Sequence, residues 1–182
     1  MTPEPPATRR LVRRTWLQAC LTALGAQGLA ATAPTPGAPY LRLKEPVSIA
    51  VGDLQLWRPH PFSAWVDKPA AEGEPAAERL LKGILMQASE KPGPESLRAL
   101  CLHCPHELCY VQLVEDLHHV RLEQSARPDH PLLVCPCHFS VFDPQKEGAL
   151  LEGPAERGLF RFRFQMRDDV VEIQEVEAAA VL

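Results

Sequence analysis

The chain has 182 residues, enough for one domain or for one domain with a small subdomain inserted in it. Its formal net charge of −4 gives no electrostatic case for binding nucleic acid, and its 46% hydrophobic residues are sufficient for a buried core. The 19 prolines favour turns and loops over long helices. Together with short apolar runs, this composition predicts a β-rich fold.

Residues 1–33 have the pattern of an export signal or a membrane anchor. The segment Arg13-Arg14-Thr15-Trp16-Leu17 resembles a twin-arginine signal and opens a mildly apolar stretch that ends at Ala33. At 19 residues, the stretch 15–33 is close to the roughly 20 that span a bilayer. Pro34 follows the small-residue sequence at 31–33 and disfavours cleavage there, so we expect a retained single anchor, with cleavage as the alternative. Residues 34–41 are expected to form a flexible linker.

Residues 42–182 are expected to form the folded domain. Short apolar runs at 46–51, 54–57 and 64–66 predict strands, whereas the apolar spacing within residues 75–88 predicts one amphipathic helix. Near the C-terminus, Phe160, Phe162, Phe164 and Met166 alternate with polar residues, and a second strand follows the turn at 167–169. The chain therefore predicts a terminal antiparallel hairpin.

Five of the six cysteines lie close together, at positions 101, 104, 109, 135 and 137. Such clustering indicates a bound metal, disulfides or both. The segments CPHELC (104–109) and CPCHFS (135–140) each contain a cysteine and a histidine close together, with one further cysteine. Two thiolates and two neutral imidazoles suit either a tetrahedral zinc or a two-iron cluster that has thiolates on one iron and imidazoles on the other.

These two segments resemble the cluster-binding loops of the Rieske iron–sulfur family, specifically of its disulfide-bearing branch in membrane complexes. That family has Cys-x-His in one loop and Cys-x-x-His in the other, and in this branch each loop carries an additional cysteine. Cys101-x-His103 repeats the first spacing but lacks the additional cysteine, because His106 stands five residues after Cys101. The resemblance implies one [2Fe–2S] cluster held by four ligands: Cys104 and Cys135 on the buried iron, and His106 and His138 on the outer iron. It also implies a disulfide between Cys109 and Cys137.

The same resemblance implies an all-β fold, an antiparallel β-sandwich with a cluster-binding subdomain inserted at about residues 99–157. It implies single-electron transfer by a subunit that is not catalytic alone, in a complex on the outer (periplasmic) face of a bacterial inner membrane. The first expectation is a quinol:cytochrome c oxidoreductase of the bc type, with a cytochrome b and a c-type cytochrome as partners and quinol at His106 and His138. The alternative is an arsenite-oxidase-like molybdoenzyme with a molybdopterin subunit. A zinc-stabilised structural module is the alternative from another class.

Several positions depart from the family pattern or are expected to tune the cluster. Residues 113–130 resemble an insertion, and its histidines, at 118, 119 and 130, are expected to be exposed. Glu107 and Leu108 stand where quinol-oxidising relatives have Leu and Gly; Leu108 is expected to shield the cluster and Glu107 to disfavour its reduction. Ser140 matches a serine that bonds a bridging sulfide.

Two phenylalanines near the second loop also differ from the bc-type pattern. Phe139 replaces a glycine, and Phe142 replaces the tyrosine of high-potential members, which predicts an intermediate potential. The run from Cys135 to Asp143 resembles the arsenite-oxidase small subunit as much as the bc-type proteins, whereas Gly153-Pro154-Ala155 resembles the third loop of the bc type. Cys101 is expected to be a buried small apolar residue near the cluster.

Overall fold

The computed structural model describes residues 39–70, 75, 77–91, 93–123 and 127–181. Ten strands form two antiparallel sheets within this part of the chain, joined by loops and four short 3₁₀ helices: η1 (Val51–Asp53), η2 (Pro94–Ser96), η3 (Leu117–His119) and η4 (Ala178–Ala180). The predicted all-β fold is confirmed. The predicted signal or anchor, and most of the predicted linker, lie outside the described residues. No helix among the described residues is long and apolar enough to cross a membrane.

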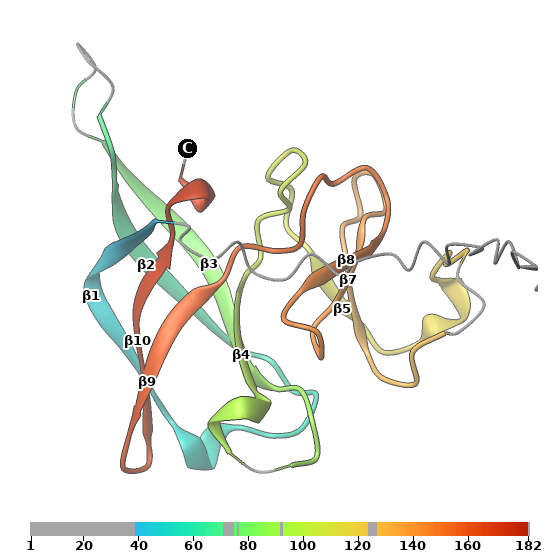
Figure 1. The fold of residues 1–182 in the computed structure, drawn as a ribbon, viewed down its shortest axis with the longest axis horizontal. Helices are drawn as coiled ribbons and strands as arrows, with labels where there is room; N and C mark the ends of the chain where they lie inside the picture. Colours follow the sequence, from blue (N-terminus) through green and yellow to red (C-terminus); the bar gives the residue numbers. More distant parts are fainter. Residues whose placement is uncertain (1–38, 71–74, 76, 92, 124–126, 182) are drawn as a thin grey trace, which may run out of the picture.

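The larger sheet has six strands in the order β4-β3-β2-β1-β10-β9 (Figure 1). Its strands are β1 (Tyr40–Ala50), β2 (His60–Lys68), β3 (Ala77–Gln87), β4 (Leu97–Cys101), β9 (Phe162–Arg167) and β10 (Val170–Glu177). The two outermost strands, β4 and β9, approach each other and bridge between Leu100 and Arg161, so the sheet curls around one apolar core. The predicted C-terminal hairpin is confirmed as β9 and β10.

The helix predicted within residues 75–88 is wrong, because this segment contains β3. β3 lies between β2 and β4, and its second half, from Gly83 to Met86, is buried on both faces. Leu81 and Leu85 enter the core of the larger sheet, whereas Ile84 and Met86 enter the core next to the second sheet. A strand segment that is buried on both faces lacks the alternation of polar and apolar residues that marks a half-exposed strand. Its apolar residues then also fit the spacing of an amphipathic helix. The predicted strand at 54–57 forms isolated bridges only.

The smaller sheet lies beside the larger one, and its segment is inserted in the chain between β4 and β9 (Figure 1). Its strands are β5 (Gln112–Val114), β6 (Leu132–Val134), β7 (Val141–Asp143) and β8 (Ala149–Glu152). They lie inside the interval 99–157 predicted from the sequence. The core next to this sheet contains Cys104, Cys135 and Phe142, and a third apolar cluster is built around Val120, Leu132 and Val141.

The segment 113–130 contributes β5 and η3 to this subdomain. His118 and His119 are exposed as predicted, but the predicted exposure of His130 is wrong. His130 is only 8% exposed, its Nε2 lies 2.8 Å from Oδ1 of the fully buried Asp143, and its ring stacks on Trp57 with centroids 5.0 Å apart. A buried carboxylate needs a compensating partner, which explains why this histidine lies inside.

Candidate metal centre

The two cysteine–histidine loops have the same backbone conformation. In the first loop, the N–H of Leu108 donates to the carbonyl of Cys104 (2.8 Å), and the N–H of Cys104 donates to the carbonyl of Cys109 (2.8 Å). In the second, Phe139 donates to Cys135 (2.9 Å) and Cys135 to Ser140 (2.8 Å). Each loop is therefore a tight turn that begins at a cysteine and holds a histidine at its tip.

Both turns pass through the left-handed region at their fifth residue. Leu108 and Phe139 each have a φ of 59°, a conformation in which the Cβ of an L-residue is crowded. This explains why the Rieske loops that these segments resemble carry glycine at the two positions. Leu108 and Phe139 therefore hold a backbone conformation that is unfavourable for residues with a Cβ. Their side chains point outward and are 41% and 67% exposed.

Two thiols lie at the base of the loops. Cys104 and Cys135 are 1% and 2% exposed, and neither forms a disulfide. Burial raises the pKa of the Cys104 thiol above its ordinary value; the backbone N–H of His106 opposes this shift, and the neighbouring Cys135 thiol adds to it. Burial thus disfavours the thiolate form of Cys104, and a bound metal would supply the positive charge that compensates it.

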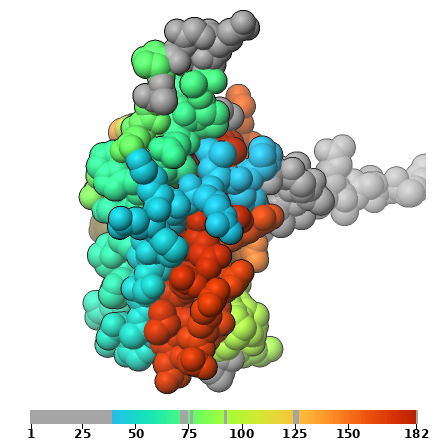
Figure 2. Space-filling model, turned by 90° about the vertical axis from the view of Figure 1, so that its left-hand side faces the viewer, coloured from blue at the N-terminus to red at the C-terminus, as the bar shows by residue number. Residues whose placement is uncertain are grey.

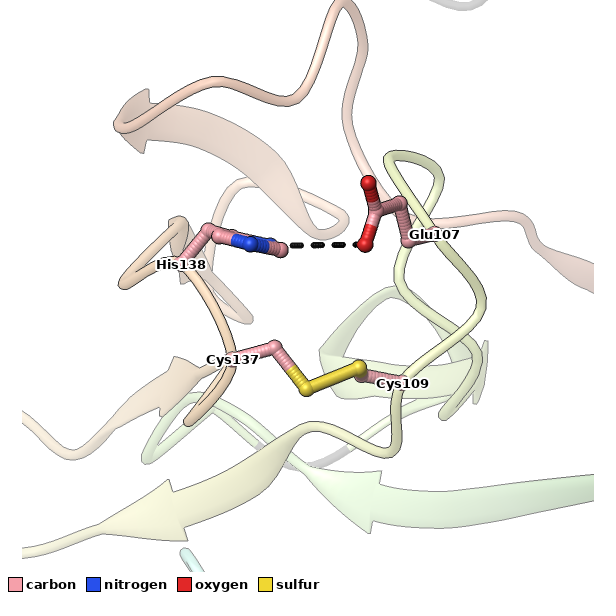
Figure 3. The surroundings of a disulfide bond; sticks show 4 residues. All are labelled: Glu107, Cys109, Cys137 and His138. Carbon is pink, nitrogen blue, oxygen red and sulfur yellow. Dashed lines mark ion pairs between the residues drawn. A yellow bond between two sulfur atoms is a disulfide. The ribbon is translucent and has the colours of Figure 1, made fainter.

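Two imidazoles lie at the exposed tips of the same loops. The rings of His106 and His138 are nearly perpendicular, at 86°, with centroids 4.9 Å apart. Glu107 lies beside them, its Oε2 3.8 Å from Nδ1 of His138 (Figure 3). An acid thus lies beside one of the two histidines that the sequence analysis expects to be ligands.

A disulfide joins the two loops. Cys109 and Cys137 are bonded, as the resemblance implied, and the bond lies directly below Glu107 and His138 in Figure 3. It fixes the separation of the two turns, so the four sulfur and nitrogen donors do not depend on packing alone for their arrangement.

A third loop closes on the second one. Ser140 is fully buried, and its Oγ accepts a hydrogen bond from the N–H of Ala155 (3.2 Å), which leaves the hydroxyl proton free to donate elsewhere. Gly153 has a φ of 101°, and a Cβ there would lie 2.4 Å from the Cα of Ser140. Only glycine allows this close approach. Phe142 is fully buried in the same core as the two thiols.

Cys101 lies in a different core from the one expected, and a contact between His103 and Tyr110 was not predicted from the sequence. Cys101 is buried as expected, but it packs in the core of the larger sheet rather than with Cys104 and Cys135. His103 and Tyr110, which form a bridge with ring centroids 5.0 Å apart, close the base of the first loop. Their pairing across the loop has no local sequence signal.

The arrangement fits a cluster with two chemically different metal positions. The protein provides two buried sulfur donors behind two exposed nitrogen donors, and the two pairs come from equivalent turns. Such a set matches two thiolates on an inner iron and two imidazoles on an outer iron. A single tetrahedral zinc would also accept four donors of these types, so metal content separates the two.

No protein-family model matches the chain, and no curated protein matches it. Among solved structures, the chain is similar to the soluble domain of the Rieske protein II (soxF) from Sulfolobus acidocaldarius, at 18% identity and a TM-score of 0.35, over 53% of this chain and 61% of that one. It is also similar to the plasma membrane Rieske protein PetC3 from Synechocystis PCC 6803, at 18% identity and a TM-score of 0.33, over 60% of this chain and 84% of that one. The chain thus spans about three fifths of the first structure, and both neighbours are Rieske proteins.

Proposed function

We propose that this protein is a Rieske-type electron carrier that holds one [2Fe–2S] cluster. Cys104 and Cys135 are the proposed ligands of the inner iron, and His106 and His138 those of the outer iron. One observation carries this proposal: two turns of identical hydrogen bonding place two buried thiols behind two exposed imidazoles, and a disulfide holds the turns together.

When bound, such a cluster accepts and releases one electron, at potentials of about −150 to +300 mV rather than the roughly −400 mV of plant-type ferredoxins, whose cluster has four cysteine ligands. The protein contributes the electrostatics around it. The neutral imidazoles replace two anionic thiolates, which favours reduction. Glu107 adds a negative charge beside His138 and opposes it. Leu108 was expected to shield the cluster, but its side chain is 41% exposed and that of Phe139 is 67% exposed.

The exposed edge of the site is the proposed point of electron exchange. His106 and His138 are the outermost donors, so a quinol or a haem-bearing partner can approach the outer iron position more closely than the inner one. The thiols are shielded from the same approach by both turns.

We propose that the carrier is the iron–sulfur subunit of a bc-type quinol:cytochrome c oxidoreductase, anchored at the outer face of a bacterial inner membrane. The apolar stretch at 15–33, followed by a proline-containing linker, supports an anchored head. The second candidate is the small subunit of an arsenite-oxidase-like molybdoenzyme, which Phe139 and Phe142 favour. Purification of the complex from membranes separates them: a cytochrome b haem accompanies the chain in the first case and molybdenum in the second.

Metal and acid-labile sulfide analysis tests the cluster itself. The proposal requires two irons and two sulfides per chain, both lost in His106→Ala and His138→Ala. The control is His118→Ala, which removes an exposed histidine of the same subdomain that lies outside the proposed ligand set, and it should keep its iron. One zinc per chain and no sulfide would establish the structural-module alternative instead.

A further inference from the structure

The larger sheet has an open seam between its two outermost strands. β4 and β9 each pair with only one neighbour along their length, β3 and β10 respectively. They meet at the bridge between Leu100 and Arg161, next to which the N–H of Cys101 donates to the carbonyl of Phe160 (2.8 Å). Toward Leu97 on β4 and Gln165 on β9 a groove of about 530 Å³ lies between the strands. The face formed by β1, β9 and β10 is seen in Figure 2.

The groove is cationic, although the whole chain is acidic. Its charged lining residues are Arg42, Arg98, Arg161 and Arg163 against Glu147 and Glu175, a formal charge of +2 within a chain of −4. This lining contains none of the four proposed metal ligands, so the seam is independent of the proposed cluster.

Of these four arginines, only Arg161 pairs with two carboxylates in the described part of the chain. Arg161 donates to Glu177 (2.9 Å) and Glu147 (2.8 Å) and holds the seam closed at its bridged end. Arg98 donates to backbone carbonyls rather than to a carboxylate, and its buried Nε has no hydrogen-bond partner among the described residues. Arg42 forms no ion pair with the part of the chain that the structure describes.

Arg163 lines this groove and contacts Tyr40 and Glu175. Its guanidinium lies 3.6 Å from the centroid of the Tyr40 ring, and its contact with Glu175 is long, at 3.4 Å, with the arginine side chain 60% exposed. A stacked, weakly paired guanidinium retains most of its donors for another carboxylate.

The strand beside the groove has two chemically different faces. Arg163 and Gln165 on β9, with Arg161 just before it, alternate with Phe162 and Phe164, which pack against the apolar core. A strand that pairs with the free edge of β9 would therefore meet arginines on one face and phenylalanines on the other. A second copy of the same edge would bring arginine against arginine, so the charge disfavours self-pairing.

We propose that the seam between β4 and β9 binds an extended acidic segment of a partner protein by β-strand addition. The segment alternates acidic and apolar residues: the acidic side chains face Arg42, Arg98 and Arg163, and the apolar ones face Phe164 and the edge of the core. Backbone pairing supplies affinity, and the alternation supplies specificity.

Fluorescence anisotropy with the purified full chain tests this proposal. The probe is a labelled eight-residue peptide that alternates glutamate and valine, and the comparison peptides replace glutamate by glutamine, or one central valine by proline. We expect the acidic peptide to bind at least ten times more tightly than either comparison peptide. It should slow hydrogen exchange of backbone amides in β9. Equal binding of the glutamine peptide, or of the proline peptide, would overturn strand addition to an acidic segment, as would the absence of binding.

Charge reversal in the groove provides the second test. Arg163→Glu and Arg42→Glu should each weaken binding of the acidic peptide at least tenfold. The matched control is Arg167→Glu, an equally exposed arginine at the far end of β9 outside the groove lining, which should change binding less than twofold. Equal losses in all three variants would show general charge attraction and contradict the proposal. Iron content of the variants should stay unchanged, which separates this result from a failure of the cluster proposal.

Discussion

Leu108 and Phe139 occupy the same place in two equivalent turns: each donates its N–H to the cysteine carbonyl four residues earlier, and each has a φ of 59°. The left-handed conformation costs an L-residue about 1–2 kcal/mol relative to its right-handed form. Glycine would avoid this cost at both positions. The two turns that carry the histidines therefore each hold an exposed apolar residue in a backbone conformation that lowers the stability of the fold.

The first prediction concerns this backbone cost. Comparison of Leu108→Gly with Leu108→Ala, and of Phe139→Gly with Phe139→Ala, removes the side chain in both cases and relieves the backbone only with glycine. We expect each glycine variant to exceed its alanine counterpart in free energy of unfolding by about 1 kcal/mol. Chemical denaturation measures the difference. An alanine variant as stable as the glycine variant would show that the turn is not under this constraint.

The second prediction concerns the disulfide. The variant Cys109→Ser/Cys137→Ser removes a cross-link between residues 28 positions apart. Loop-closure entropy predicts a loss of about 3–4 kcal/mol in the free energy of unfolding. The separation of the two turns is then less restrained, so the variant should also lose its iron faster in the presence of a chelator. An unchanged half-life of the bound iron would mean that the disulfide does not hold the site together.

The third prediction concerns the residue behind the thiols. Phe142 is fully buried in the core that also contains Cys104 and Cys135, so we expect a hydroxyl added by Phe142→Tyr to reach one of the two sulfurs. A new hydrogen bond to a ligand sulfur should raise the midpoint potential. The control Phe164→Tyr, on β9 in the larger sheet, should leave the potential unchanged. No rise in Phe142→Tyr would count against the placement of this residue beside the cluster.

The fourth prediction concerns the buried pair formed by His130 and Asp143. Asp143→Ala removes the buried acceptor next to His130 and the backbone N–H of Gln145, and leaving buried polar groups unsatisfied costs about 1–3 kcal/mol of unfolding free energy. Asp129 also lies near His130, at 3.5 Å, but its side chain is fully exposed. Asp129→Ala should therefore change stability by less than about 0.5 kcal/mol. Similar effects of the two substitutions would contradict the structural role of Asp143.

The fifth prediction concerns pH and Cys101. Burial raises the pKa of this thiol from 9.0 to about 12, against the opposing backbone N–H of His103. Because the folded state holds the neutral thiol, its contribution to stability is present below about pH 9 and is lost as the pH rises from 9 toward 12. Peptide mapping after alkylation at about pH 9 should find Cys101 unmodified in the folded protein and modified after denaturation. Rapid alkylation of Cys101 itself in the folded protein would contradict its burial.

The parts of the site that sequence reasoning anticipated are local. The spacing of Cys104 and His106, and of Cys135 and His138, lies within single turns, so the sequence itself brings each pair together. The pairing of Cys109 with Cys137 followed from the family resemblance, and the structure contains it. Alternation along β9 was visible because one of its faces is exposed.

The parts that were not anticipated depend on contacts across the fold. The second half of β3 is buried on both faces, which hides its alternation and led to a predicted helix. The burial of His130 depends on Asp143, 13 residues away, and on Trp57, which belongs to a different part of the fold. The seam depends on how the six strands are ordered, which no local pattern encodes.

The measurement that tests the central proposal most directly is a redox titration of the purified protein followed by electron paramagnetic resonance. We expect mild reduction to produce one rhombic Rieske-type signal per chain, with an intermediate midpoint potential, and we expect His106→Ala and His138→Ala to abolish it. Protein that shows no signal at any potential and contains zinc instead of iron would contradict the proposed cluster.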